Sequence, residues 1–89
     1  MTAINKTFVV GRLTSDPVFS GTVNKKSATF NIIDNEVTHK VVTNGKTASL
    51  CKTYLRTGNL CCIEGHYDNL KNVVVAEKVT FLSKVYRQN

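Results

Sequence analysis

The chain has 89 residues, and its 12 lysines and arginines against 6 aspartates and glutamates give it a formal net charge of +6. This length suits a single domain over residues 1–89 and excludes most enzyme folds with two lobes and a deep cleft. An apolar fraction of 42% predicts a folded chain, and no run of residues is apolar for long enough to span a membrane. Because the first residues lack the apolar run of a signal peptide, we expect a cytoplasmic protein.

The positive charges are spread along the whole chain and form no basic tail. This distribution predicts a folded body with a positive surface, whose natural partners are polyanions: nucleic acid first, an acidic membrane second. A charge that serves only solubility is the alternative.

The three cysteines, Cys51, Cys61 and Cys62, cannot form a full disulfide framework, so we interpret them as small buried apolar residues. His39 and His66 each stand alone, without the paired spacing of a zinc site, and the sequence predicts no metal and no cofactor. The acidic residues fall mostly at turns and show no paired carboxylates with a histidine. This pattern argues against a nuclease or another enzyme.

The first predicted strand covers residues 7–13 and is apolar on both faces. Phe8 and Val10 fall on one side and Val9 on the other. Two apolar faces in so small a protein suggest a barrel core on one side and a subunit contact on the other. Gly11 stands where a barrel strand would need to bend sharply.

A loop is expected next, because Pro17 breaks the strand pattern and the segment that follows contains Gly21, Asn24, Lys25 and Lys26. Residues 27–33 alternate between apolar and polar side chains, which predicts a second strand. A third strand is expected over residues 36–43, after a short turn.

The period of the apolar residues then changes to that of a short amphipathic helix over residues 46–57. Thr47 is its expected N-cap and Gly58 its expected C′ residue. Two further strands are predicted over residues 60–67 and 73–82, and the latter is interrupted at Glu77–Lys78, where a bulge would account for the break.

Three strands, a helix and two strands form the element order of an all-β fold, the five-stranded oligonucleotide-binding (OB) Greek-key barrel with one short helix between strands 3 and 4. A ferredoxin-like sandwich would need a helix between its first two strands, where Pro17 argues against one. An SH3-like barrel lacks a full helix after its third strand.

Several segments resemble the bacterial single-stranded DNA-binding proteins. Residues 5–17, NKTFVVGRLTSDP, are similar to the N-terminal signature of that family. Similar segments follow at residues 28–32, 39–46, 54–58 and 63–65, so the resemblance covers nearly the whole chain.

The chain departs from that family in two ways. Family members place large aromatic residues on the third strand, whereas the matching positions here are Thr38 and Asn44, and the chain contains no tryptophan. Members also carry a tail with an acidic tip, whereas this sequence stops at a basic end directly after its last predicted strand. In both respects it is similar to primosomal replication proteins of the PriB type.

The resemblance implies sequence-independent binding of single-stranded DNA in replication, recombination or repair, by a homodimer or homotetramer. The alternative is a primosome adaptor that holds DNA weakly and docks another replication protein. RNA binding in the cold-shock manner is disfavoured, because its stacking motifs are missing.

Two kinds of residue are expected to contact the DNA: basic residues that bind phosphates and aromatic rings that stack on bases. Val42 is added because it shares with Lys40 the strand face that meets DNA in the family. These candidates are Lys6, Arg12, Phe19, Lys25, Lys26, Lys40, Val42, Lys46, Lys52, Tyr67 and Tyr86. The expected oligomer interface consists of Asn5, Phe8, Val9 and His39. Three phenylalanines share strand faces with aliphatic residues and are predicted to pack in the core: Phe8, Phe30 and Phe81.

Overall fold

Strands account for most of the chain. The computed structural model describes residues 6–22 and 25–83. Its elements in chain order are β1 (Thr7–Leu13), β2 (Val18–Thr22), β3 (Lys25–Asp34), β4 (Val37–Asn44), α1 (Gly45–Tyr54), β5 (Leu60–Asp68) and β6 (Val73–Phe81).

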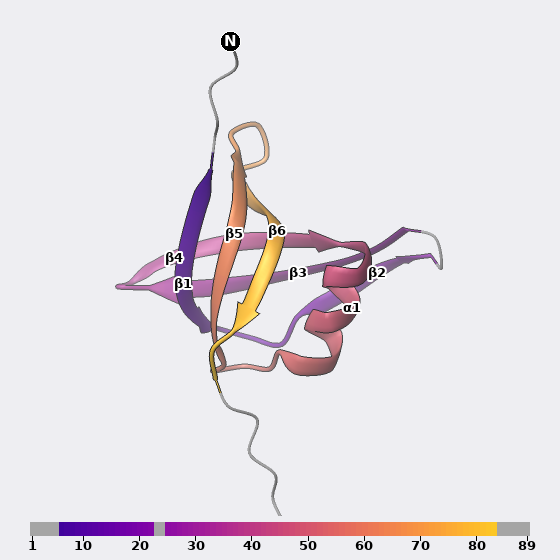
Figure 1. Cartoon of the computed structure of the whole chain (residues 1–89). Helices are drawn as coiled ribbons and strands as arrows, with labels where there is room; N and C mark the ends of the chain where they lie inside the picture. Colours follow the sequence, from indigo (N-terminus) through magenta and orange to yellow (C-terminus); the bar gives the residue numbers. More distant parts are fainter. Residues whose placement is uncertain (1–5, 23–24, 84–89) are drawn as a thin grey trace, which may run out of the picture.

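Five of the strands close into a barrel (Figure 1). The sheet runs in the order β1-β5-β6-β4-β3-β2, and the end of β1 also pairs with β3 through Arg12 and Leu13, which closes the ring. All neighbours are antiparallel except β4 and β6, where Val41 and Val42 pair in parallel with β6. The predicted OB barrel, with its helix between the third and fourth barrel strands, is confirmed.

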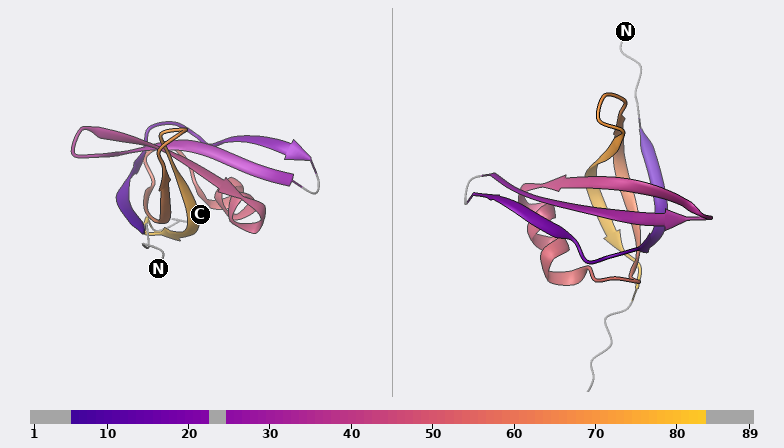
Figure 2. Two further views of the ribbon diagram at one scale, coloured as in Figure 1. Left: turned by 90° about the horizontal axis from the view of Figure 1, so that it is seen from above. Right: turned by 180° about the vertical axis from the view of Figure 1, so that it is seen from behind.

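The predicted loop before the second barrel strand is partly wrong. Residues 18–22 form β2, which pairs with the first half of β3 from Val18–Thr29 to Thr22–Lys25. Lys25 and Lys26 are therefore strand residues. Every residue of β2 is exposed, because the β2–β3 hairpin extends beyond the barrel (Figure 2). A strand without a buried face has no apolar alternation, and this one is held by backbone pairing.

The core lies inside the barrel, where every second residue along the barrel strands points inward. Phe30, Ile32, Val41 and Ile63 are all at most 2% exposed. Cys51 of α1 belongs to the same cluster, so the helix covers one side of the barrel as the apolar pattern predicted.

The helix begins earlier and ends earlier than predicted. Its N-cap is Asn44, with no side-chain cap, and not Thr47; its C-cap is Leu55. Gly58 lies three residues beyond that cap and is not C′. Its N–H donates to the Leu13 carbonyl at 2.9 Å, so it ties the loop after α1 to the end of β1.

The interruption predicted in the last strand is a bulge. Glu64 pairs with Lys78 and Gly65 with Ala76, which leaves Glu77 as the extra residue on β6. The strand continues on both sides of it, to Phe81.

Of the phenylalanines predicted in the core, two pack there and one does not. Phe30 is 2% exposed, and Phe81 packs against the core while partly buried. Phe8 is 63% exposed on the outer side of β1, because its neighbour Val9 takes the inward position. Among the described residues, no helix is long and apolar enough to cross a membrane.

Candidate nucleic-acid interface

The outer side of the paired strands β3 and β4 presents polar and aliphatic side chains. Val42 lies opposite Thr29, and Lys40 lies opposite Asn31. The residues between them, such as Val41, point into the core, so strand alternation directs these four outward. Lys40 is exposed and the other three are half-buried. We call these four residues the β3–β4 outer face.

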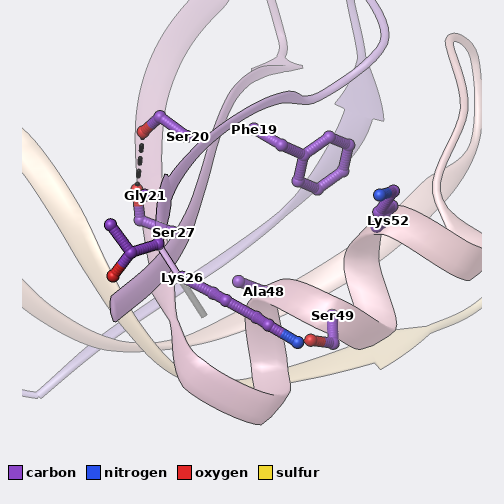
Figure 3. A pocket seen from close by; sticks show the side chains of 9 residues that line it. Phe19, Ser20, Gly21, Lys26, Ser27, Ala48, Ser49 and Lys52 are labelled. Atoms are coloured by element: carbon purple, nitrogen blue, oxygen red, sulfur yellow. Dashed lines mark hydrogen bonds between the residues drawn. The ribbon is translucent and has the colours of Figure 1, made fainter. Parts of the chain in front are cut away.

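A pocket of about 350 Å³ lies between the β2–β3 hairpin and α1 (Figure 3). The hairpin contributes Phe19, Ser20, Lys26 and Ser27 to its lining, and the helix contributes Lys52 among others. We call it the hairpin–helix pocket. It brings together three of the residues that the sequence predicted for DNA binding, one ring and two lysines.

The contacts within this pocket place a cation beside a ring. Lys52 Nζ lies over the Phe19 ring, 5.8 Å from its centroid, which is within cation–π range. The hydroxyls of Ser20 and Ser27 are hydrogen-bonded across the hairpin, Oγ to Oγ at 3.1 Å.

Lys6 lies apart from both of these places, in an ion-pair cluster on the outer side of β5 and β6. Its Nζ donates to Glu77 Oε1 at 3.2 Å and lies 3.6 Å from Glu64 Oε2. His66 Nδ1 approaches the other oxygen of Glu77 at 3.2 Å. The hydrogen bond to Glu77 is the main cause that raises the pKa of Lys6. The Lys6 charge therefore already faces two carboxylates.

The remaining predicted DNA contacts are scattered. Arg12 projects from β1 and donates through Nη1 to the Gly58 carbonyl at 3.0 Å. Lys25 and Lys46 are exposed at the starts of β3 and α1. Tyr67 lies near the end of β5, where its hydroxyl donates to Asn72 Oδ1 at 2.9 Å. Tyr86 lies outside the described residues.

The residues predicted at an oligomer interface also separate. Val9 is 6% exposed and belongs to the core, so it offers no surface to a second chain. Phe8 and Val10, 63% and 45% exposed, form the outer side of β1. His39 is half-buried on β4, opposite Ile32. Asn5 lies outside the described residues.

Sequence reasoning missed the small hydroxyl residues of the pocket, namely Ser20, Thr22, Ser27 and Ser49. They lie on β2, on the start of β3 and on α1, and only the pairing of β2 with β3 brings the hairpin over the helix. Because no residue of β2 is buried, the sequence carries no alternation that could have indicated this strand or the pocket beside it. No group of three or more potential metal ligands occurs among the described residues, and all three cysteines are free, with Cys51 and Cys61 buried and Cys62 half-buried.

The fold is similar to that of a solved structure, the wild-type single-stranded DNA binding protein from Thermus aquaticus. The two superpose with a TM-score of 0.81 at 21% sequence identity. The match covers 97% of this chain and 44% of that one, so this chain spans less than half the length of its structural relative. No match is found among the curated proteins. Residues 4–78 match the model of the single-strand binding protein family. The chain therefore belongs to the single-strand binding protein family.

Proposed function

We propose that this protein binds single-stranded DNA without sequence preference and without catalysing a reaction on it. The family match over residues 4–78 carries this proposal. A net charge of +6 supports it, because cations that neutralise phosphates release counterions from the strand. Replication, recombination and repair are the processes in which such a binder would act, in the cytoplasm.

The β3–β4 outer face is the proposed contact surface for the strand. Lys40 supplies a cation there, and the half-buried side chains of Val42 and Thr29 lie beside it. These side chains are not rings, so we expect phosphate contacts to contribute more to affinity here than base stacking.

A salt titration tests this proposal. Labelled oligo-dT is titrated with the protein at several salt concentrations, and the slope of log K against log salt is measured. We expect binding at low salt that weakens as salt rises. Absence of binding at low salt, or an affinity indifferent to salt, contradicts the proposal, and DNA cleavage during long incubation with magnesium contradicts its non-catalytic part.

The contribution of Lys40 is measured by Lys40→Gln in the same titration. One lost phosphate contact should flatten the salt slope by about 0.7 for a single strand. Lys71→Gln is the matched control, since Lys71 is an exposed lysine in the turn between β5 and β6. A slope that changes equally in both variants would show that Lys40 acts only through the overall charge.

A second candidate function is a primosome-type adaptor that holds DNA weakly and docks another replication protein. The absence of rings among the four residues of the β3–β4 outer face favours it, because stacking supplies about 1–3 kcal/mol per base where rings are present. Pull-down with helicase and primase components distinguishes the two. Tight DNA binding with no captured partner would exclude the adaptor.

The assembly is proposed to be a homodimer or homotetramer formed through the outer side of β1. Phe8 and Val10 supply exposed apolar surface on that strand. The mass of the protein in solution tests this, and a monomer at all concentrations would contradict it.

A further inference from the structure

The hairpin–helix pocket lies on a different face of β3 from the β3–β4 outer face. Phe19 of β2 pairs with Ala28, which is fully buried and faces inward. Lys26 stands two residues before Ala28, on the same side of β3, whereas Thr29 is on the opposite side. The pocket is therefore a second candidate site, formed where the hairpin approaches α1 (Figure 3).

The charges around the pocket select an anion. Lys26 and Lys52 line it, and none of the residues that the structure places around it is acidic. In the described part of the chain, the ion pairs to carboxylates involve Lys6 and His66 and neither of these two lysines. Figure 3 shows the Lys26 side chain extended along the pocket toward Ser49 of α1. Two ammonium groups are thus available to a negatively charged ligand.

The ring and the size of the pocket narrow the choice of anion. Phe19 is 37% exposed and lines the pocket beside Lys52, whose Nζ lies 5.8 Å from the ring centroid. An inorganic phosphate would pair with the lysines and would not make use of this ring. A volume of about 350 Å³ lies near the lower end of ligand pockets and is sufficient for one nucleotide. Bases of every kind stack on an aromatic ring, and phosphates pair with lysine.

We propose that the hairpin–helix pocket binds one nucleotide, with the base against Phe19 and the phosphate held by Lys26 and Lys52. The inference deepens the proposed function and rests on it where the nucleotide is part of a bound strand. A free nucleotide has the same chemistry, and the experiment separates the two sources. A bound strand would run from the β3–β4 outer face around the β2–β3 hairpin to this pocket. The pocket would then extend the DNA-binding site beyond the barrel.

The experiment follows backbone amide signals of the labelled protein by NMR during titration with dTMP, thymidine, inorganic phosphate and oligo-dT. We expect dTMP to shift the signals of Phe19, Ser49 and Lys52 in a saturable way. Thymidine or phosphate alone at the same concentrations should shift them less, because each lacks one half of the interaction. Oligo-dT that saturates the same signals identifies a nucleotide within a strand, and shifts with dTMP alone identify a free nucleotide.

Variants separate the two halves of the interaction. Phe19→Leu should weaken dTMP binding about fivefold or more, the lower end of what one stacked base contributes. Lys52→Gln should reduce the difference between dTMP and thymidine. Lys71→Gln makes the same charge change in the turn between β5 and β6, outside the pocket lining, and should leave dTMP binding unchanged.

Two results would overturn the inference. Oligo-dT that binds and shifts signals of β3 and β4 while no nucleotide moves the pocket signals would refute the pocket site and leave the proposed function standing. An acidic peptide that shifts the pocket signals when dTMP does not would assign the pocket to protein docking. Failure of oligo-dT to bind at all would instead refute the proposed function. The dTMP titration would then show by itself whether the pocket binds a free nucleotide.

Discussion

Single side chains fasten the loops of this small barrel, and Asp16 shows how. One oxygen of its carboxylate accepts two hydrogen bonds from Thr57, from the backbone N–H and from the hydroxyl, each at 2.8 Å. These bonds join the loop after β1 to the loop after α1. The backbone hydrogen bond is the main cause that lowers the pKa of Asp16 below its ordinary value of 3.8.

This lowered pKa gives stability a pH dependence with a definite sign. Since the folded protein binds the proton less well than the unfolded chain, the contribution is present above pH 3.8 and is lost as the pH falls through the lower pKa of the folded state. We expect Asp16→Ala to lower the melting temperature at pH 7, and the difference from the parent protein to shrink in acid. Thermal unfolding followed by circular dichroism from pH 7 to pH 2 measures this, and a difference constant with pH would contradict it. Asp34→Ala removes an exposed carboxylate at the end of β3 and is the control.

The buried cysteines give a second prediction for single residues. Burial raises the pKa of the Cys61 thiol to about 12 and that of the Cys51 thiol to about 11. Because the thiolate is the reactive form, neither should react with a disulfide reagent at pH 8 while the protein is folded. We expect at most one thiol, that of Cys62, to react, and three after denaturation. Two fast-reacting thiols in the native protein, or one in a Cys62→Ser variant, would contradict this.

At the scale of elements, the strand and helix patterns that depend on burial could be predicted from the sequence. The alternation around Phe30 and Ile32 identified a strand because those residues fill the barrel. The spacing of Ala48 and Cys51 identified a helix for the same reason, since both are buried. Even the bulge at Glu77 was detectable, because two charged residues interrupt an apolar run.

Elements and sites held by other forces could not be predicted in the same way. Strand β2 has no buried residue, so its pairing with β3 left no periodic signal. The hairpin–helix pocket depends on that pairing, and its lysines and ring were proposed singly, without their common location. The start of α1 differs from the predicted one because Asn44 is both the last residue of β4 and the N-cap of the helix. Its side chain makes no capping hydrogen bond, so the capping rule that pointed to Thr47 did not apply.

The closure of the barrel by strand β1 depends on a close backbone contact at Gly11. The end of β1 pairs with β5 and β3 at once, since Arg12 lies opposite both Leu60 and Ile33. A Cβ added at the preceding residue, Gly11, would lie 2.5 Å from the Ile33 carbonyl oxygen. That contact is with backbone and cannot be relieved by a side-chain rotation. Gly11→Ala should therefore destabilise the protein by about 1–3 kcal/mol in urea unfolding. Thr80→Ala is the control, because it trims an exposed side chain on β6 away from this contact. Equal effects from the two changes would contradict the steric argument.

On the scale of the whole molecule, the positive charges are divided among separate places. Lys40 lies on the outer face of the barrel, Lys26 and Lys52 line the hairpin–helix pocket, and Lys6 is paired with glutamates. A strand that used the first two places would have to follow the β2–β3 hairpin. The basic residues therefore occupy several separate places on the surface and do not form a single stripe.

The outer side of β1 exposes apolar side chains, which predicts that a second copy of the chain binds there. Phe8 is 63% exposed, and Val10 beside it is 45% exposed, on a strand whose inner residues already fill the core. If a second copy covers this strand, Phe8→Gln should weaken association, since burying a large apolar side chain contributes about 1.5–3 kcal/mol. Size-exclusion chromatography with light scattering over a range of concentrations should show the variant dissociating at a higher concentration than the parent protein. Leu70→Gln changes a 96% exposed residue in the β5–β6 turn and should leave the mass unchanged. Should Phe8→Gln also leave it unchanged, the contact lies elsewhere on the molecule.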